Sequence, residues 1–288
     1  MRRLLEARTN VGHHLLTAKL KQNSLANKSA LWAVSQRGAI SKLDAEGRRT
    51  RIGGPCGAKP RRIVVSGDDT IWLAASLDNH SWGLFQRLST GWTLRRRSWG
   101  HAVIGGSPTG GAWMVERREL VRVEDGVVAD RVAAPFEPIC VSAGRDGSIW
   151  ALGGRTRFGG HSVHRYESDA KSWRTLPEPA AAVRVAATAD GAAWSISSHG
   201  QLWRLHPSGA GHFRECRLVP SCTNCLYSKQ NRTYRDLAVD ASGCVWLLSS
   251  AELGAQVVSR ITDIAARSTD DFPISRIVSI AASVVIVS

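Results

Sequence analysis

A strand-like motif with a tryptophan at its centre recurs through the chain, and this repeat limits the possible folds more than any other feature. The successive tryptophans are separated by 40, 41, 37, 44 and 52 positions. Periods of this length are typical of propellers and other repeat architectures, because each repeat buries its apolar face against its neighbours. The tryptophans of the repeat are Trp32, Trp72, Trp113, Trp150, Trp194 and Trp246.

Each repeat shows the same order of strands and turns. A turn-forming residue such as Asp69 or Gly147 stands three positions before the tryptophan, and a short apolar strand precedes that turn. A third strand follows the tryptophan, and several repeats have a fourth, for example 172–176. Four short antiparallel strands per forty residues form the blade of a β-propeller. The sequence therefore predicts an all-β fold, a closed propeller of six or seven four-stranded blades, with seven favoured.

The preference for seven blades rests on the two ends of the chain. Segments 276–280 and 284–287 repeat the first two strands of a blade. We expect one domain over residues 1–288, in which this half blade joins N-terminal strands such as 15–20 and closes the ring. The long interval before Trp246 predicts a blade insertion or a long loop over 206–232.

The segment 141–152, which reads Val-Ser-Ala-Gly-Arg-Asp-Gly-Ser-Ile-Trp-Ala-Leu, resembles the repeat of the tectonin family of β-propellers, and 185–194 and 237–246 fit the same pattern. The resemblance covers nearly the whole chain from about residue 23. It implies either lectin-like recognition of bacterial glycans and lipopolysaccharide or a scaffold role in membrane trafficking and autophagy. Seven-bladed lyases similar to streptogramin-inactivating enzymes also place Asp-Gly before a tryptophan strand, so a propeller lyase with acid–base residues in its channel is a further alternative.

The chain is strongly basic, with 38 Lys and Arg against 24 Asp and Glu. Such a surface attracts anions, whether acidic proteins, acidic lipids, anionic glycans or nucleic acids. One cation recurs on the third strand of every recognisable blade, which would present a ring of charge to an anionic ligand. We favour the structural interpretation, in which these side chains stack on the tryptophans as cation–π pairs. The recurring cations are Lys42, Arg87, Arg122, Arg165, Arg204 and Arg260.

The repeat tryptophans lie mid-strand between apolar neighbours, which predicts core packing. Four other tryptophans, Trp82, Trp92, Trp99 and Trp203, are expected at the surface, with Trp82 and Trp99 as candidates for ligand contact. The run 95–99, Arg-Arg-Arg-Ser-Trp, combines cations with an aromatic ring, as sites for single-stranded nucleic acid do. A solvated loop or edge strand is the favoured interpretation of this run, and specific nucleic-acid binding is not expected.

Six cysteines are few for a disulfide scaffold of this length, so we expect reduced thiols. Cys216, Cys222 and Cys225, together with His212, would supply the four ligands of a tetrahedral zinc site. The spacing lacks a second paired motif, so free loop thiols are favoured over a structural zinc, and no other cofactor is expected.

The sequence lacks a nucleophile elbow, a phosphate-binding loop and a zinc-protease motif. Its basic start is not followed by the apolar run of a secretory signal, and its longest apolar stretch is too short to span a bilayer. We expect a cytoplasmic protein, or a secreted one if a leader is missing. The predicted function is a non-enzymatic interaction platform for an acidic or membrane-associated protein partner. The alternative is lectin-like binding of an anionic glycan or lipopolysaccharide, and peripheral membrane contact is compatible with either function.

Overall fold

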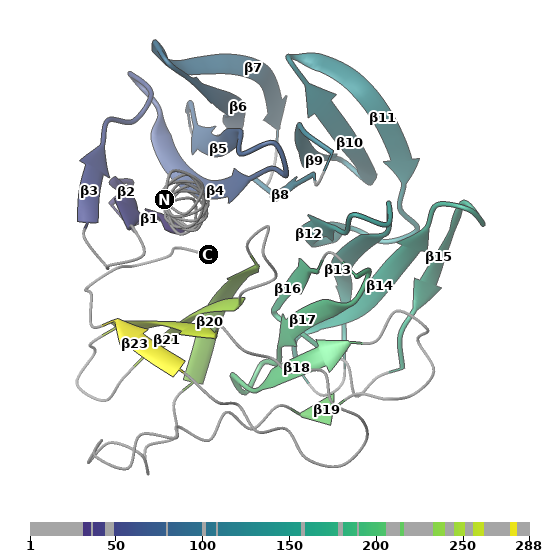
Figure 1. The fold of residues 1–288 in the computed structure, drawn as a ribbon. Coiled ribbons are helices and arrows are strands. Elements are labelled where there is room, and N and C mark those ends of the chain that lie inside the picture. Colours follow the sequence, from purple (N-terminus) through teal and green to yellow (C-terminus); the bar gives the residue numbers. More distant parts are fainter. Residues whose placement is uncertain are drawn as a thin grey trace, which may run out of the picture.

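The computed structural model describes residues 31–35, 37–43, 49–78, 80–99, 102–107, 109–156, 159–177, 181–188, 190–205, 214–215, 233–239, 245–250, 256–261 and 277–280. These residues form 23 strands in six antiparallel sheets, which follow one another around a common axis (Figure 1). Within this described part of the chain, no helix is long and apolar enough to cross a membrane.

The strands of the first three sheets follow the chain in order. The first sheet consists of β1 (Leu31–Val34), β2 (Ile40–Leu43) and β3 (Arg49–Ile52). The second consists of β4 (Lys59–Val65), β5 (Ile71–Ser76), β6 (Ser81–Leu88) and β7 (Gly91–Trp99). The third consists of β8 (Ile104–Gly106), β9 (Ala112–Glu116), β10 (Glu119–Glu124) and β11 (Val127–Ala133).

The other three sheets repeat this arrangement. The fourth consists of β12 (Pro138–Ala143), β13 (Ile149–Arg155), β14 (His161–Glu167) and β15 (Ser172–Thr175). The fifth consists of β16 (Arg184–Ala187), β17 (Ala193–Ile196), β18 (Leu202–Leu205) and β19 (Arg214–Glu215). The sixth consists of β20 (Thr233–Val239), β21 (Val245–Ser250), β22 (Gln256–Ile261) and β23 (Ile277–Ile280).

The all-β propeller fold predicted from the repeat is confirmed, but the predicted number of blades is wrong. The described residues contain five four-stranded blades, which are the second to sixth sheets, and a first sheet of three strands; each blade is given the number of its sheet. Trp32 lies on the first strand of its sheet, whereas Trp72 and the later repeat tryptophans lie on the second strand. Among the described residues, the first sheet therefore lacks the strand that precedes the tryptophan strand in every other blade.

The C-terminal segment does not begin a seventh blade. Strand β23 pairs with β22, with Arg260 opposite Val278, and is the outermost strand of the sixth sheet. The expectation that residues 276–280 start another blade is therefore wrong, because they complete the blade of Trp246. Segments 15–20 and 284–287 lie outside the described residues. Of the predicted insertion 206–232 only 214–215 is described, and these residues form the outer strand β19, which pairs with β18.

The four turns before tryptophan strands that the structure describes have the geometry that the sequence predicts. Asp69, Gly110, Gly147 and Gly191 all have positive φ, between 61° and 104°, which is the left-handed conformation that favours glycine. In the fourth blade the carboxylate of Asp146 accepts hydrogen bonds from the backbone N–H and the hydroxyl of Ser148, at 3.1 and 2.6 Å. Such a local side-chain bond stabilises the turn and so fixes the register of the hairpin.

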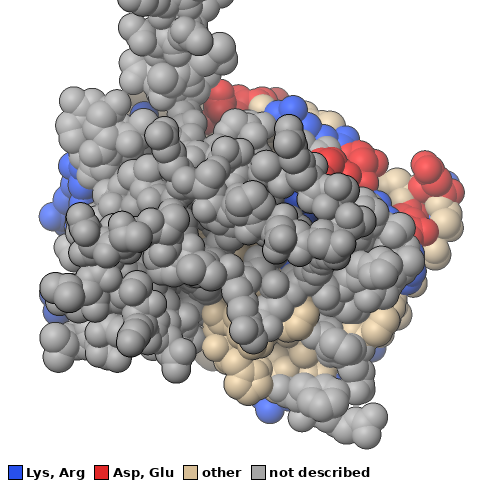
Figure 2. All heavy atoms as spheres, turned by 60° about the horizontal axis from the view of Figure 1, so that its bottom comes forward, with Lys and Arg blue, Asp and Glu red and all other residues tan. Residues whose placement is uncertain are grey.

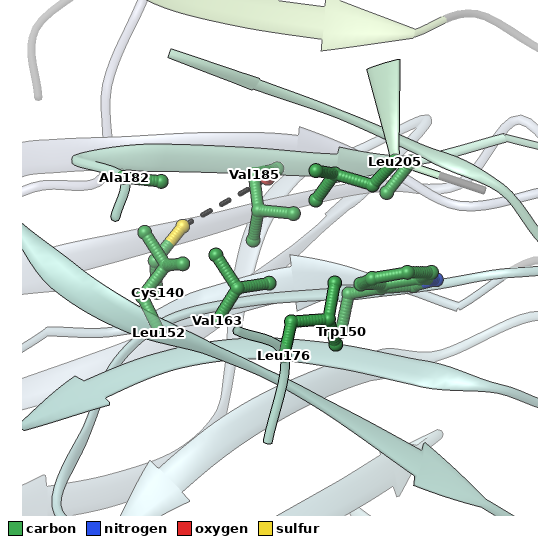
Figure 3. Packing of buried hydrophobic residues seen from close by; sticks show 9 residues of the cluster. Cys140, Trp150, Leu152, Val163, Leu176, Ala182, Val185 and Leu205 are labelled. Atoms are coloured by element: carbon green, nitrogen blue, oxygen red, sulfur yellow. Dashed lines mark hydrogen bonds between the residues drawn. The ribbon is translucent and has the colours of Figure 1, made fainter. Parts of the chain in front are cut away.

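The core lies between neighbouring blades, where the face of one sheet packs on the face of the next. The first strands β4, β8, β12, β16 and β20 lie next to one another in that order and surround the axis (Figure 1). Between the fourth and fifth blades, Trp150 packs in one cluster with Val163 from its own sheet and with Val185 and Leu205 from the next (Figure 3). Cys140 lies in the same cluster, and its thiol contacts the carbonyl of Val185 at 3.9 Å. Each blade is thus stabilised by its neighbours.

Candidate functional site

An open cleft of about 750 Å³ lies at the rim of the propeller, between the second and third blades. It is formed by the end of β7, the turn that joins β9 to β10, and the outer strand β11. Strands β7 and β11 are the outermost strands of their sheets (Figure 1). The cleft that they help to form therefore lies far from the axis. Five arginines and two glutamates line the cleft, which we call the arginine cleft; the arginines are Arg96, Arg97, Arg117, Arg118 and Arg131.

Two of the five arginines are held by glutamates within the cleft. Arg96 of β7 donates two hydrogen bonds to the carboxylate of Glu116 of β9, one of them at 2.9 Å, and so links the two blades. This pairing raises the pKa of Arg96 above its ordinary value. Arg131 of β11 donates to Glu119 at 2.9 Å and also lies 4.0 Å from Glu116. These pairs stiffen the walls of the cleft and neutralise two of its cations.

The other three arginines, Arg97, Arg117 and Arg118, are exposed. No hydrogen bond or ion pair joins their side chains to any other residue that the structure describes. The arginine cleft therefore carries a net charge of +3 from its lining residues. Such clustered guanidinium groups suit binding of carboxylate or phosphate oxygens, because each presents several donors in a planar fork.

The turn that carries two of these cations has an unusual residue choice. Arg117 and Arg118 are the two residues that join β9 to β10, and Arg117 has φ = 59°. Glycine or asparagine is preferred at such a position, and another L-residue there costs roughly 1–2 kcal/mol. A cationic side chain is therefore present at the cleft despite a local cost in stability, which is a feature that often marks functional residues.

Trp99 lies at the end of β7 and lines the same cleft. Its side chain is 73% exposed, more than any other large hydrophobic residue that the structure describes. The preceding residue Ser98 is buried, because side chains along a strand alternate between the two faces of the sheet. Trp99 therefore adds little to the core and presents an aromatic surface beside the arginines.

The recurring third-strand cations lie against aromatic rings. Lys42 lies 6.0 Å from the centre of the Trp32 ring, and Arg165 lies 5.7 Å from that of Trp150. Arg204 stands over Trp194 in the same way, also at 5.7 Å. This arrangement is the cation–π pairing of the structural interpretation.

Two of the recurring cations depart from this pattern. Arg87 stands over Trp92, at 5.4 Å, because the register of β5 and β6 places Gln86 rather than Arg87 opposite Trp72. Arg122 lies opposite Trp113 in the sheet register, and its guanidinium donates to Glu124. Arg260 lies opposite Trp246, and its side chain is outside the described part of the structure.

Carboxylates already pair with several of the recurring cations. Arg165 donates to Asp146 at 3.1 Å, and Arg204 donates to Asp190 at 3.0 Å. Both acids belong to the turn that precedes the tryptophan strand of the same blade. Three of the recurring cations, Arg122, Arg165 and Arg204, are therefore paired with carboxylates, in contrast to the three exposed arginines of the cleft.

The division of the tryptophans into buried and exposed side chains differs in part from the sequence prediction. Trp72, Trp113, Trp150 and Trp194 are at most 5% exposed and pack in the core as predicted. Trp82 is only 2% exposed, so its predicted place at the surface and in ligand contact is wrong.

The burial of Trp82 comes from the third blade, because Trp82 packs with Leu84 of its own strand and with Ile104 of β8. Trp92 and Trp203 are half-buried, and the indole N–H of Trp92 donates to the carbonyl of Gly53 at 2.7 Å. Of the four tryptophans predicted at the surface, only Trp99 is exposed.

The proposed zinc ligands Cys216, Cys222, Cys225 and His212 lie outside the described residues. Among the residues that are described, no group of three or more His, Cys, Asp or Glu side chains could hold a metal ion. Cys56 is exposed and Cys140 is buried, and both are free thiols.

The sequence analysis singled out the run 95–99, which forms one wall of the cleft, but it favoured a solvated loop or edge strand there, and it did not single out the residues of the other wall. The run 95–99 combined cations with Trp99, but Arg117 and Arg118 lie about twenty residues later and reach the same place only because neighbouring blades pack together. One feature of the sequence could have indicated Arg117 and Arg118: two arginines occupy a two-residue hairpin turn, where Asn-Gly is the usual choice.

On the face shown in Figure 2, described basic and acidic side chains lie beside one another along the edge of the molecule. On this face, basic side chains therefore have acidic neighbours at several places. A cluster of cations without acidic partners, such as that of the arginine cleft, is more informative than the net charge.

The fold defines the chain as a β-propeller protein. No family model matches the chain, and no curated protein matches it in sequence. Similar solved structures include TolB from Acinetobacter baumannii, with 13% identity and a TM-score of 0.58 over 81% of this chain and 60% of that chain. A protein from Lactobacillus plantarum has 11% identity and a TM-score of 0.51 over 81% of this chain and 78% of that chain. YCF48 bound to D1 peptide has 15% identity and a TM-score of 0.49 over 81% and 76%.

These likenesses concern the fold alone, and the chain spans less than two thirds of the TolB chain. The resemblance to tectonin repeats and the absence of enzymatic activity remain predictions from the sequence.

Proposed function

We propose that this propeller is a non-enzymatic interaction platform that binds an acidic segment of a partner protein in the arginine cleft. The observation that carries the proposal is the group of three exposed arginines, Arg97, Arg117 and Arg118, which lack acidic partners among the described residues and lie beside the exposed ring of Trp99. Arginine and tryptophan are the residues most enriched at the energetic centres of protein interfaces.

The rigidity of the cleft supports this function. Arg97 lies on a strand whose register with β6 places it opposite Gly83, and the turn at 117–118 is closed by the pairing of Glu116 with Glu119. The ion pair between Arg96 and Glu116 joins the two walls. A binding surface that is already ordered loses less conformational entropy on binding, which raises affinity.

A lectin-like function is the second candidate, and the exposed ring of Trp99 is the observation that favours it. An aromatic ring at the surface can stack on the apolar face of a sugar, while the neighbouring arginines would bind an anionic substituent. The resemblance of the repeats to those of tectonins supports the same candidate. The two functions differ in their ligand and share the cleft.

One array experiment distinguishes them. The array carries acidic peptides, bacterial glycans, lipopolysaccharides and anionic phospholipids, and binding is measured at low and high salt. The cleft variant combines Arg97→Ala, Arg117→Ala and Arg118→Ala. The control variant removes the same charge from exposed arginines far from the cleft in sequence, through Arg37→Ala, Arg145→Ala and Arg155→Ala.

We expect wild-type and control proteins to bind a subset of the acidic peptides, and the cleft variant to lose this binding. Salt should weaken the binding, because contacts between exposed charges are screened. Selective binding of a glycan instead would favour the lectin-like function. Equal loss in the cleft and control variants would contradict the proposed site, because net charge alone would then explain binding.

A further inference from the structure

We infer that the group recognised in the arginine cleft is a single phosphorylated side chain of a partner protein, with an apolar residue of the same segment packed on Trp99. This inference rests on the proposed function and names the chemistry of its ligand. It follows from the balance of charge inside the cleft, the position of its glutamates and the spacing of residues along β7.

The number of unpaired cations exceeds what one carboxylate needs. A carboxylate carries one negative charge and is satisfied by one guanidinium fork, whereas a phosphoryl group carries roughly −1.5 to −2 and has three acceptor oxygens. After Glu116 and Glu119 are paired with Arg96 and Arg131, the lining residues still have three guanidinium groups without a partner. A phosphoryl group is therefore the better match in charge and in the number of hydrogen bonds.

The three cations come from two blades and line one cleft. Arg97 lies on β7 of the second blade, and Arg117 and Arg118 form the turn between β9 and β10 of the third. Both elements are fixed by strand pairing up to the residues concerned. Clusters of arginines are a recurring means of recognising phosphorylated or acidic segments.

The two glutamates of the cleft disfavour the binding of a polyanion. Glu116 and Glu119 have side chains that are 19% and 48% exposed, and both line the cleft. A nucleic acid or a sulfated glycan carries a charge on every unit and would bring several of them close to these carboxylates. A single phosphoryl group can contact the three unpaired arginines and leave both glutamates on their own partners. The charge pattern therefore favours an isolated dianion in a protein segment over nucleic acid.

The spacing along β7 indicates where an apolar residue would lie. Arg97 and Trp99 are two positions apart on a regular part of the strand, so their side chains point to the same face and lie about 7 Å apart along it. An extended peptide has the same repeat between alternate side chains. A peptide lying along β7 with its phosphorylated residue at Arg97 would place the residue two positions away on the ring of Trp99.

The experiment uses three immobilised nonapeptide libraries, whose central residue is fixed as phosphoserine, glutamate or serine and whose other positions are randomised. Purified full-length wild-type protein, the cleft variant, the control variant and Trp99→Ala are each passed over the libraries. We expect wild-type and control proteins to prefer the phosphoserine library over the glutamate library by about tenfold or more, since one or two additional hydrogen bonds between charged groups are worth that factor.

The retained wild-type peptides should be enriched in aromatic or other apolar residues two positions from the phosphoserine. Trp99→Ala should lose this positional preference and keep the preference for phosphoserine. The cleft variant should bind the phosphoserine and serine libraries equally. Circular dichroism of every variant verifies that it is folded before its binding is compared.

Equal binding of the phosphoserine and glutamate libraries by wild-type protein would overturn the inference while leaving the proposed binding of acidic segments intact. Unchanged phosphoserine binding by the folded cleft variant would overturn both, because the site would then lie elsewhere. Stronger binding of a single-stranded RNA of random sequence than of the phosphoserine library, in the same assay, would overturn the inference in favour of a polyanion.

Discussion

Replacing Trp150 by alanine should destabilise the propeller by about 3–5 kcal/mol, whereas the same replacement at Trp99 should change its stability by less than about 0.5 kcal/mol. Trp150 is 0% exposed and packs against residues of two blades. A buried tryptophan removes roughly 150–250 Å² from water, worth about 4–6 kcal/mol at roughly 25 cal/mol/Å². Contact with Arg165, 5.7 Å from the ring centre, adds roughly 0.5–1 kcal/mol. Partial relaxation of the neighbours and the retained Cβ bring the net loss into the stated range.

The two variants are compared by guanidinium unfolding followed by far-ultraviolet circular dichroism, which does not depend on tryptophan fluorescence. Trp99→Ala is the matched control, because the chemical change is identical and Trp99 is 73% exposed. A loss of less than about 1 kcal/mol for Trp150→Ala would refute the assignment of the repeat tryptophans to the core, because cavity formation at a fully buried tryptophan costs several times more. A loss at Trp99 as large as that at Trp150 would refute its assignment to the cleft surface.

Three further predictions test the turns and a buried histidine. Arg117→Gly should leave the stability unchanged or raise it by up to about 1 kcal/mol. The substitution relieves the strain of the left-handed conformation, and the greater flexibility of glycine in the unfolded chain offsets this gain only in part. A lower stability on thermal unfolding would contradict this account of the turn. Gly191→Ala should destabilise the protein by roughly 1–2 kcal/mol or more, because Gly191 has a φ of +78° and an added Cβ would clash with Asp146. Gly53→Ala is the control and should be nearly neutral in the same thermal unfolding assay, because no atom lies within 4 Å of its added Cβ. Burial lowers the pKa of His164 in the folded protein. Below about pH 6.5 the unfolded chain therefore binds a proton at His164 more readily than the folded chain does, and the stability should fall as the pH drops. In His164→Gln the melting temperature should fall less between neutral and mildly acidic pH, and an identical decline in both proteins would exclude this contribution.

The sequence was sufficient to predict the class of fold, because the tryptophan period, the turn residues and the strand patterns agree with one another. Asp69 and Gly147 adopt the left-handed conformation expected of them, and Trp72 and Trp150 are in the core. Turn geometry and the pairing of two strands within one hairpin are local properties, so a single repeat already contains the information that determines them.

The number of blades was harder to predict because it depends on which strands pair at the ends of the ring. Residues 277–280 have the apolar pattern of an inner strand as well as that of an outer one. Their pairing with β22 makes them the outer strand of the sixth sheet. Periodicity identifies a strand but does not determine which neighbour it joins.

The side chains of the candidate site were also only partly predictable from the pattern of single repeats. Trp82 lies on β6 and Trp99 on the neighbouring strand β7, and both have similar polar surroundings in the sequence, yet Trp82 is buried by the third blade and Trp99 is exposed. Arg117 and Arg118 join Arg97 only through packing between blades. Contacts between repeats determine which side chains are buried and bring together charges that are distant in the sequence. The pattern of a single repeat does not predict these contacts.

The most direct test of the account is isothermal titration of wild-type, cleft-variant and control proteins with the acidic peptide that binds best on the array. The account predicts that the Kd rises by about thirtyfold or more in the cleft variant, since several hydrogen bonds to charged groups are lost, and stays nearly unchanged in the control variant. An equal rise in both variants would show that binding depends on net charge alone and would contradict a specific site in the arginine cleft.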